Sequence, residues 1–471
     1  MRGMDRRSIV RTAAGASAAI LLLSWSWPAA GQQGPLTLGD ALARADRGAY
    51  ANRMAEGERR TQAGEGLRAL QGILPTVRLE GGYGRTTDPI GAFGITLRQR
   101  SITQQDFDPA LLNHPDATVN YTGAVVVEQP LVNADAWLGR RAATHATAAR
   151  AAAARWTSVQ TRVDVVGAYF GSVLAHAQVR TLEEAHEAAR GHVRQAESMA
   201  EQGMVTRSDA LLAQVKAGEI ETQLIEARGA ASLVKRQLAM LLGAPADTSF
   251  ALPAELPAAK RVFALNESVI PTPAETMSEA VAPESRGDVQ AALSAHAAAR
   301  TDVRRARSVW LPRLNGMARY DWNSPDAPFG GQENWSIGVV ASWTPFAGAS
   351  QVAGVRAAAG REEVARAQAE AARAQAELDV ASRSNAWTVA LERLRIAGDA
   401  VAQSVEAHRI VTRKYEGGLA TVVELLAASA AETEARLREA HARYEAVVRG
   451  AELLRSVGRD PALLADWAVD S

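Results

Sequence analysis

An internal duplication constrains the fold of this chain more than any other feature. Pro130, in VVVEQPLVNA, aligns with Pro345, in VASWTPFAGA, at an offset of 215 residues. The same offset holds without a gap over more than 110 residues. It pairs Gly203 with Gly418, Thr206 with Thr421, Asp209 with Glu424, and Gly243 with Gly458. The chain is therefore expected to contain two copies of one structural unit.

Each half shows the same order of patterns: a helical run, two extended segments, a very long helix, a glycine turn and a shorter helix. The expected divisions are a first repeat over 32–243, an irregular proline-rich linker over 244–274, a second repeat over 275–458 and a C-terminal tail over 459–471. LPTV at 74–77 matches LPRL at 311–314 at an offset of 237. The first half therefore has 22 more residues between its two extended segments.

The long helices are expected over 132–201 and 347–416. Their apolar residues alternate spacings of four and three, as from Val159 to Ala177 and from Trp387 to Tyr415. That spacing is typical of a coiled-coil seam. Seventy helical residues reach roughly 105 Å, and two runs of about 38 residues placed end to end reach a similar length. Each half can therefore pair one long helix with two short ones.

The extended segments, around 76–86, 118–130, 312–322 and 334–345, alternate apolar with polar residues. This period of two predicts strands with one apolar and one polar face. A lipid-embedded barrel with a wet lumen shows this pattern, and so does a soluble antiparallel sheet. Four strands cannot close a transmembrane barrel, which needs about eight, so several chains would contribute strands. The aromatic residues expected to face lipid are Tyr121, Tyr320, Trp322, Trp335 and Trp343.

The N-terminal segment 1–31 reads as a signal peptide: the basic stretch MRGMDRRSIVR precedes the apolar run AAGASAAILLLSW. An N-terminal membrane anchor is the alternative, although the run is short for a span. The chain has no cysteine, and 52 basic residues balance 52 acidic ones, which argues against nucleic acid as a partner. The eight histidines include no i, i+4 pair, and no catalytic or nucleotide-binding motif occurs. No catalytic residue, cofactor or metal site is therefore predicted.

With these halves, the chain resembles the TolC-type outer-membrane channel family, the exit ducts of tripartite efflux pumps and type I secretion systems. The resemblance runs from TLGDALARA at 37–45 to the LLRSVGRD stretch, and its most specific motifs are ILPTV, WLPRL, QPL, TPF and the two glycine turns. It implies an α+β membrane protein: a long α-helical coiled-coil barrel joined to a transmembrane β-barrel, with four strands and two helical hairpins per chain. It also implies a homotrimer in the outer membrane of a Gram-negative cell, with helices in the periplasm, a periplasmic adaptor protein and an inner-membrane transporter.

The resemblance gives the two turns a role at the periplasmic entrance. The residues concerned are Gly203, Thr206, Asp209, Gly417, Gly418, Thr421 and Glu424. Glu424 matches an acid that lines the constriction in several family members, whereas Ala420 and Ala427 stand where many members carry charged residues. The local alternative is a capping box, in which Thr421 and Glu424 satisfy free N–H groups at the helix start. The two roles are compatible.

A protein of another class, a periplasmic adaptor or a structural coiled-coil protein, is the alternative interpretation of the whole chain. Adaptors also have long helical hairpins, but usually one per chain, flanked by small β domains. Two hairpins at a constant offset, and two pairs of strands with membrane-type faces, favour the channel.

Overall fold

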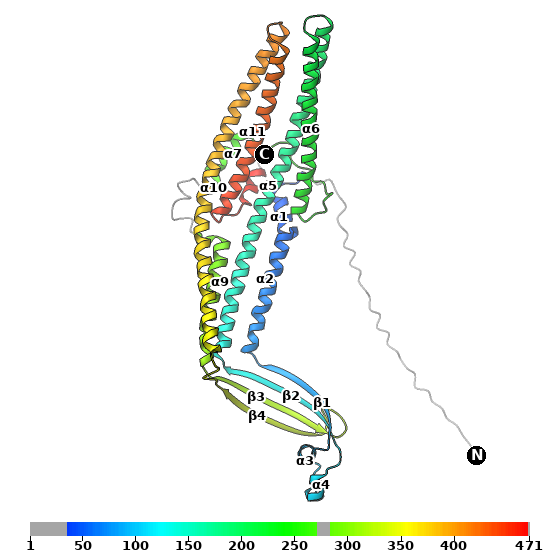
Figure 1. Cartoon of the computed structure of the whole chain (residues 1–471), viewed down its shortest axis with the longest axis vertical. Helices are drawn as coiled ribbons and strands as arrows, with labels where there is room; N and C mark the ends of the chain where they lie inside the picture. Colours follow the sequence, from blue (N-terminus) through cyan, green and yellow to red (C-terminus); the bar gives the residue numbers. More distant parts are fainter. Residues whose placement is uncertain (1–34, 271–282, 470–471) are drawn as a thin grey trace, which may run out of the picture.

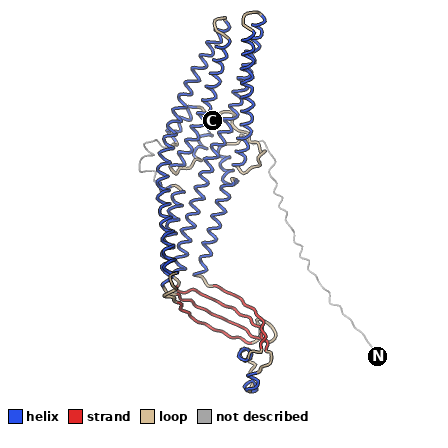
Figure 2. The backbone as a smooth tube through the Cα atoms, viewed as in Figure 1, coloured by secondary structure: helices blue, strands red, loops and turns tan. Residues whose placement is uncertain are grey.

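A computed structural model of the chain describes residues 35–270 and 283–469, so the predicted signal peptide lies outside the described residues. Long helices run side by side along most of the molecule, and all the strands gather at one end of it (Figures 1 and 2). Within the described ranges, no helix is both long and apolar enough to cross a membrane.

The two halves contain equivalent elements. In the first half these are α1 (Leu38–Gly48), α2 (Tyr50–Arg68), β1 (Thr76–Thr86), β2 (Thr118–Val132), α5 (Ala134–Glu201) and α6 (Arg207–Leu241). In the second half they are α9 (Gly287–Arg307), β3 (Arg313–Ser324), β4 (Gln332–Ser342), α10 (Ser350–Glu416) and α11 (Val422–Ser456). Short 3-10 turns, η1 (Ala69–Gly72) and η4 (Ser308–Trp310), lead into β1 and β3. The structure thus confirms the fold class, with four strands and two helical hairpins in duplicated halves.

Each long helix packs against two shorter stretches. Helix α5 has 68 residues and lies along α1, α2 and α6, whereas α10 has 67 residues and lies along α9 and α11. Contacts of α5 with α9 and α11 join the two halves. In Figure 1, α6 lies beyond α1 and α2 along α5, and α11 lies beyond α9 along α10, as expected from the helix lengths.

The short helices meet end to end at two joints. At the first joint, Gly243 follows α6 with a φ of 68° and lies against Gly48; an added Cβ at Gly48 would lie 2.6 Å from the carbonyl oxygen of Leu242. At the second joint, Gly458 follows α11 with a φ of 75° and lies against Ser285, just before α9. Both glycines adopt the left-handed conformation that ends a helix, and they are related by the repeat offset.

The main hydrophobic core lies at the level of the joints, midway along the helices. Val166 and Phe170 of α5, Trp387 of α10 and Leu454 of α11 are all buried there. Two further helices contribute to this core: α7 (Ala259–Ser268) and α12 (Leu463–Val469). The segment 244–274 was predicted to be irregular, but α7 lies within it. This helix is stabilised by packing, since Val262 and Leu265 on its apolar side are completely buried.

The strands form one antiparallel sheet in the order β1-β2-β3-β4. Strand β2 pairs with β3, so the central pairing joins the two halves. The connection between β1 and β2 contains α3 (Pro89–Arg98), η2 (Gln104–Phe107) and α4 (Pro109–Asn113). The sequence had indicated only that this connection is 22 residues longer than its equivalent in the second half. Strand β4 ends at Ser342, so Trp343 lies immediately after it.

Candidate functional site: hairpin tips and amphipathic sheet

The two glycine turns have the same backbone structure. Gly203 and Gly418 both have a φ of 73°. Gly418 N donates to Tyr415 O and Leu419 N donates to Lys414 O, at 3.0 and 2.8 Å, and the equivalent bonds close the first turn. This pattern satisfies carbonyl groups left free at a helix end. Gly417 has a φ of −86°, so Gly418 alone requires the conformational freedom of glycine.

Both return helices begin with a capping box. Thr421 N donates to Glu424 Oε2 at 2.7 Å, and Glu424 N donates to Thr421 Oγ1 at 3.2 Å. Thr206 and Asp209 make the same two bonds at 3.0 and 3.2 Å. The local prediction for Thr421 and Glu424 is thereby confirmed. Two hydrogen bonds from Thr421 lower the pKa of Glu424, and the bond from the backbone N–H contributes more than the bond from the hydroxyl. The carboxylate of Glu424 therefore stays charged at neutral pH.

A small apolar cluster joins the two hairpins beneath the turns. Tyr415 and Leu425 of the second hairpin are 2 % and 1 % exposed, and they pack with Ala196 and Ala213 of the first. The apex residues have the opposite character: Met204 is 59 % exposed and its equivalent Leu419 is 82 % exposed. Met204 and Leu419 were not predicted from the sequence, although the repeat offset pairs them, whereas Tyr415 was expected only as the last residue of the heptad seam that starts at Trp387.

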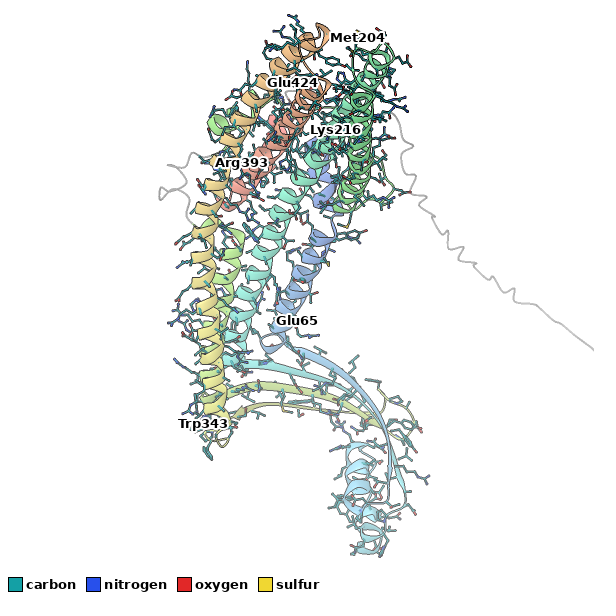
Figure 3. All side chains as sticks on the ribbon, turned by 45° about the horizontal axis from the view of Figure 1, so that its top comes forward. Glu65, Met204, Lys216, Trp343, Arg393 and Glu424 are labelled. Atoms are coloured by element: carbon teal, nitrogen blue, oxygen red, sulfur yellow. The ribbon has the colours of Figure 1, made fainter. Side chains whose placement is uncertain are left out.

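A groove between the hairpins runs down from the tips. It lies between α6 and α11, with α5 contributing Leu182 and Ala189, and its lining is mainly apolar with charged residues among it. Its apolar lining includes Leu212 and Ile220 of α6 and Val423 and Ala427 of α11. In Figure 3, Glu424 and Lys216 are labelled on these two helices, near the end where the turns lie.

The sheet has one apolar face. Val77, Leu79, Ile337 and Val339 lie on it and are each at least 63 % exposed. The pairing register places four of the predicted aromatics on this same face: Tyr121, Tyr320, Trp322 and Trp335. Tyr83, opposite Tyr121 on β1, adds a ring whose centre lies 5.0 Å from that of Tyr121.

The aromatic residues of the apolar face concentrate near the strand ends that lie away from the helices, where Phe329 packs against Trp322 with ring centres 5.8 Å apart. A second group surrounds the strand ends that join the helices: Trp137, Trp310, Trp343 and Phe346, all exposed. Trp343 Nε1 donates to Trp310 O at 3.0 Å, and Figure 3 shows Trp343 at the base of the helices. Two aromatic belts around an apolar band are typical of a surface in contact with lipid.

The other face of the sheet is polar. Arg319 contacts Glu80 at 2.9 Å and Asp321 at 3.7 Å, which links β3 to β1 across β2. Arg78 contacts Glu80 and Glu128, each at 3.5 Å. Near the far end, Asn120 Nδ2 donates to Asn323 Oδ1 at 2.8 Å, and both side chains are buried. A network of paired charges and amides suits a face turned toward water.

Among the described residues, no group of three His, Asp or Glu side chains is placed to hold a metal ion. The chemistry that this arrangement supports is therefore that of surfaces: an apolar face with aromatic belts, a charged face and two tips with exposed apolar apexes.

Comparison with known proteins agrees with this geometry. The family model for outer membrane efflux proteins matches residues 68–244 and 281–459. The chain is similar to the solved structure of VceC from Vibrio cholerae, with 19% identity, a TM-score of 0.73 and coverage of 90% of this chain and 96% of that one. For the CmeC channel of Campylobacter jejuni the identity is 15%, the TM-score 0.74 and the coverage 96% and 94%. The open MtrE channel of Neisseria gonorrhoeae matches with 17% identity, a TM-score of 0.68 and coverage of 91% and 90%.

No curated protein sequence matches the chain. The matched family is one of transport ducts and not of enzymes or adaptor proteins, so the family match favours the channel interpretation over the adaptor or structural coiled coil. It assigns the protein to the outer membrane and to efflux, as the resemblance implied. With more than two thirds of its length covered by the family model, this chain belongs to the outer membrane efflux protein family.

Proposed function

We propose that three copies of this chain form a passive duct across the outer membrane and the periplasm, opened when an adaptor protein and an inner-membrane transporter engage the hairpin tips. The sheet is the main support for the proposal: it has an exposed apolar face with aromatic belts and a charged face. Its edge strands, β1 and β4, each have an outer edge that pairs with no other strand among the described residues. Edge strands present free N–H and C=O groups. Joining β4 of one copy to β1 of the next satisfies them, and three copies supply twelve strands.

The helices support the same assembly. Exposed apolar residues recur along α6, at Leu211, Val215, Ile225 and Leu233, and along the half of α10 that lies beside α11, at Val389, Ile396, Val405 and Ile410. These two helices lie at opposite edges of the chain in Figure 1. Two different apolar edges fit a heterologous interface, which closes into a ring when the rotation between copies is right. Burying such edges is favourable by about 25 cal/mol per Å² of apolar surface.

The tips support contact with an adaptor. Met204 and Leu419 are exposed apolar residues at the two apexes, and the groove between α6 and α11 opens beside them. Apolar grooves of this kind accept a helix from a partner. The family is one of outer membrane efflux proteins, and the resemblance of the sequence to TolC-type channels implies a pump and an adaptor. A helical hairpin of that adaptor is the partner that fits this groove.

Assembly is tested first, on outer-membrane fractions. We expect unheated samples to migrate as a trimer on a gel and heated samples as a monomer. Purified protein should form ion-conducting channels in planar lipid bilayers. A chain that stays in solution without detergent, or that never conducts, contradicts the proposal.

Glu424 provides the test of the entrance. Three Glu424 carboxylates around one axis would attract cations. Glu424→Gln keeps an oxygen that can accept the bond from Thr421 N but removes the charge, so we expect the reversal potential in a salt gradient to shift away from cation preference. Asp209→Asn is the matched control at the first tip, where we expect a smaller shift. An unchanged reversal potential in Glu424→Gln would reduce Glu424 to a helix cap.

A further inference from the structure

The excursion between β1 and β2, residues 87–117, lies at the end of the sheet farthest from the helices (Figure 1). It has its own small core, in which the rings of Phe93 and Phe107 meet edge to face at 5.8 Å and Ala92 is 2 % exposed. The equivalent connection in the second half, between β3 and β4, is only 325–331. The excursion is therefore a folded unit that one half has and the other lacks.

The excursion is fixed to the polar face of the sheet. Gln99 Nε2 donates to Val119 O and to Asn120 Oδ1, each at 2.9 Å. Asn120 in turn donates to Asn323 on β3. At the edge strand β4, Arg100 Nη2 donates to Glu333 O at 3.1 Å, and Asn334 Nδ2 donates to Arg98 O at 3.4 Å. The end of α3 thus reaches across the polar face from β2 to β4.

The shorter connection lies on the opposite face. The ring of Phe329 covers Gly123 on the apolar face, where an added Cβ would lie 2.7 Å from the ring. The two connections at one end of the sheet therefore have different surroundings. In the proposed duct the apolar face meets lipid and the polar face lines the lumen, so the excursion lies on the lumen side.

The excursion exposes apolar side chains that no other part of the described chain covers. Ile90 is 85 % exposed, Phe107 60 % and Leu111 51 %. On a lumen side filled with water, such side chains are unfavourable unless they meet other apolar groups. The bonds to Glu333 and Asn334 place the excursion against an edge strand, which is where the next copy would begin.

The dimensions of the proposed barrel favour a second copy as the partner. Twelve strands spaced ~4.8 Å apart and tilted by about 40° close to a diameter of roughly 24 Å. Three helices with side chains, each about 10 Å across, occupy a circle of roughly 22 Å when they touch one another. One helix from each excursion is therefore enough to crowd the opening, and each excursion also contains α4, so their exposed apolar residues come close together.

We propose that the excursions of three copies meet over the lumen and narrow the outer mouth of the duct through Ile90, Phe107 and Leu111. This inference rests on the proposed trimeric channel. The occupant of the apolar surface is the same segment of the neighbouring copies. The duct then has a constriction at each end: the hairpin tips at one and this apolar contact at the other.

The absence of cysteine from the chain makes cross-linking a clean test. Ile90→Cys and Leu111→Cys are made separately in the full chain, and assembled protein is treated with a short bis-maleimide. We expect a shift from monomer to covalent dimer on a denaturing gel for both variants. Leu79→Cys is the matched control: Leu79 is 70 % exposed on the apolar face of the sheet, and we expect it to stay monomeric.

The outcome separates the two proposals. If the variants assemble into heat-modifiable trimers that conduct, but neither Ile90→Cys nor Leu111→Cys gives covalent dimers beyond the Leu79→Cys level, the outer constriction is wrong and the duct stands. If no variant and no wild-type protein forms trimers or conducts, the duct itself is wrong. A covalent dimer in conducting protein supports both.

Discussion

The two joints occupy equivalent places in the duplicated halves but are built from different interactions. At the first joint Ala49, which is 2 % exposed, lies beside Gly48 and Gly243. At the second joint the equivalent position is Arg286, whose side chain is 4 % exposed. The guanidinium of Arg286 contacts Asp288 at 2.8 Å and Asp379 at 3.1 Å. Its Cζ atom lies 4.7 Å from the ring centre of Trp156 on α5.

The difference extends to the carboxylates on the long helices. Asp164 on α5 and Asp379 on α10 are equivalent in the repeat. Desolvation by the surrounding helices, which is only partial for the exposed Asp164, favours the neutral form of both. Asp379 also contacts Arg383, Arg455 and Arg286, which together lower its pKa. Asp164 accepts a bond from neutral Gln160, and desolvation raises its pKa. The same backbone arrangement therefore accommodates an apolar joint in one half and a charged joint in the other, because the buried arginine of the charged joint is paired with carboxylates.

The largest effect is expected from removing the buried cation. Arg286→Ala places at the second joint the residue that the first joint has at Ala49. It also removes the guanidinium that Asp379 and Asp288 contact. Breaking a buried ion pair from one side typically costs about 3 kcal/mol or more, and we expect about 3 here because Arg383 and Arg455 still contact Asp379. Thermal unfolding followed by circular dichroism measures it. Arg155→Ala, at an exposed position next to Trp156 on α5, is the control and should change little.

Substituting the joint glycines should destabilise the first joint more than the second. An added Cβ at Gly243 overlaps the backbone oxygen of Gly48, which cannot move alone, whereas at Gly458 it lies 2.7 Å from Ser285 Oγ, which can rotate. Both positions have a positive φ, which is strained for alanine. We expect Gly243→Ala to lower the free energy of unfolding by about 2–3 kcal/mol and Gly458→Ala by about 1–2. Gly203→Ala, at a positive φ with no atom within 4 Å, isolates the backbone strain; equal losses in all three would refute the steric argument.

The capping boxes should behave alike in the two halves. Thr421→Ala and Thr206→Ala each remove the hydroxyl that caps a helix start, which typically costs about 1 kcal/mol. In both boxes this hydroxyl accepts the backbone N–H of the acidic residue at 3.2 Å, and the bond from the threonine backbone N–H to the carboxylate remains after the substitution, so the two losses should be equal. Amide hydrogen exchange in the first turns of α11 and α6 measures each loss locally. Exchange that stays at the wild-type level in both variants would show that the boxes contribute nothing.

The smallest effect is expected at Asp164. Because its folded-state pKa is raised, its ionisation opposes folding once the pH rises above about 3.8. Asp164→Asn should therefore stabilise the protein at pH 7, by no more than about 0.5 kcal/mol because the side chain is exposed to solvent. For Asp379 the sign is reversed: its lowered pKa stabilises the fold above pH 3.8, and that contribution is lost as the pH falls through the folded-state pKa. Unfolding curves between pH 3 and 7 test this, and a destabilised Asp164→Asn at pH 7 would contradict it.

Periodicity and the repeat offset were sufficient to predict the long helices and the shorter helices that pack along them. They also predicted the four strands, the faces of the sheet and the two turns. They succeeded because these features depend on local chemistry: a heptad seam, a period of two, a left-handed glycine and a threonine three residues before an acid. They did not predict α7, α12 or the helices of the excursion, since each is too short for a clear period and is stabilised by what it packs against.

By itself, the sequence determined that the chain is duplicated, with two long helical hairpins and an amphipathic sheet. Only the tertiary structure decided that β2 pairs with β3 to join the halves, that the short helices meet end to end at two chemically different joints, and that the excursion lies on the polar face. These features depend on contacts between residues far apart in the chain, such as Arg286 with Asp379 and Arg100 with the backbone of Glu333. No local pattern encodes those contacts, because each partner is chosen by the packing of whole elements.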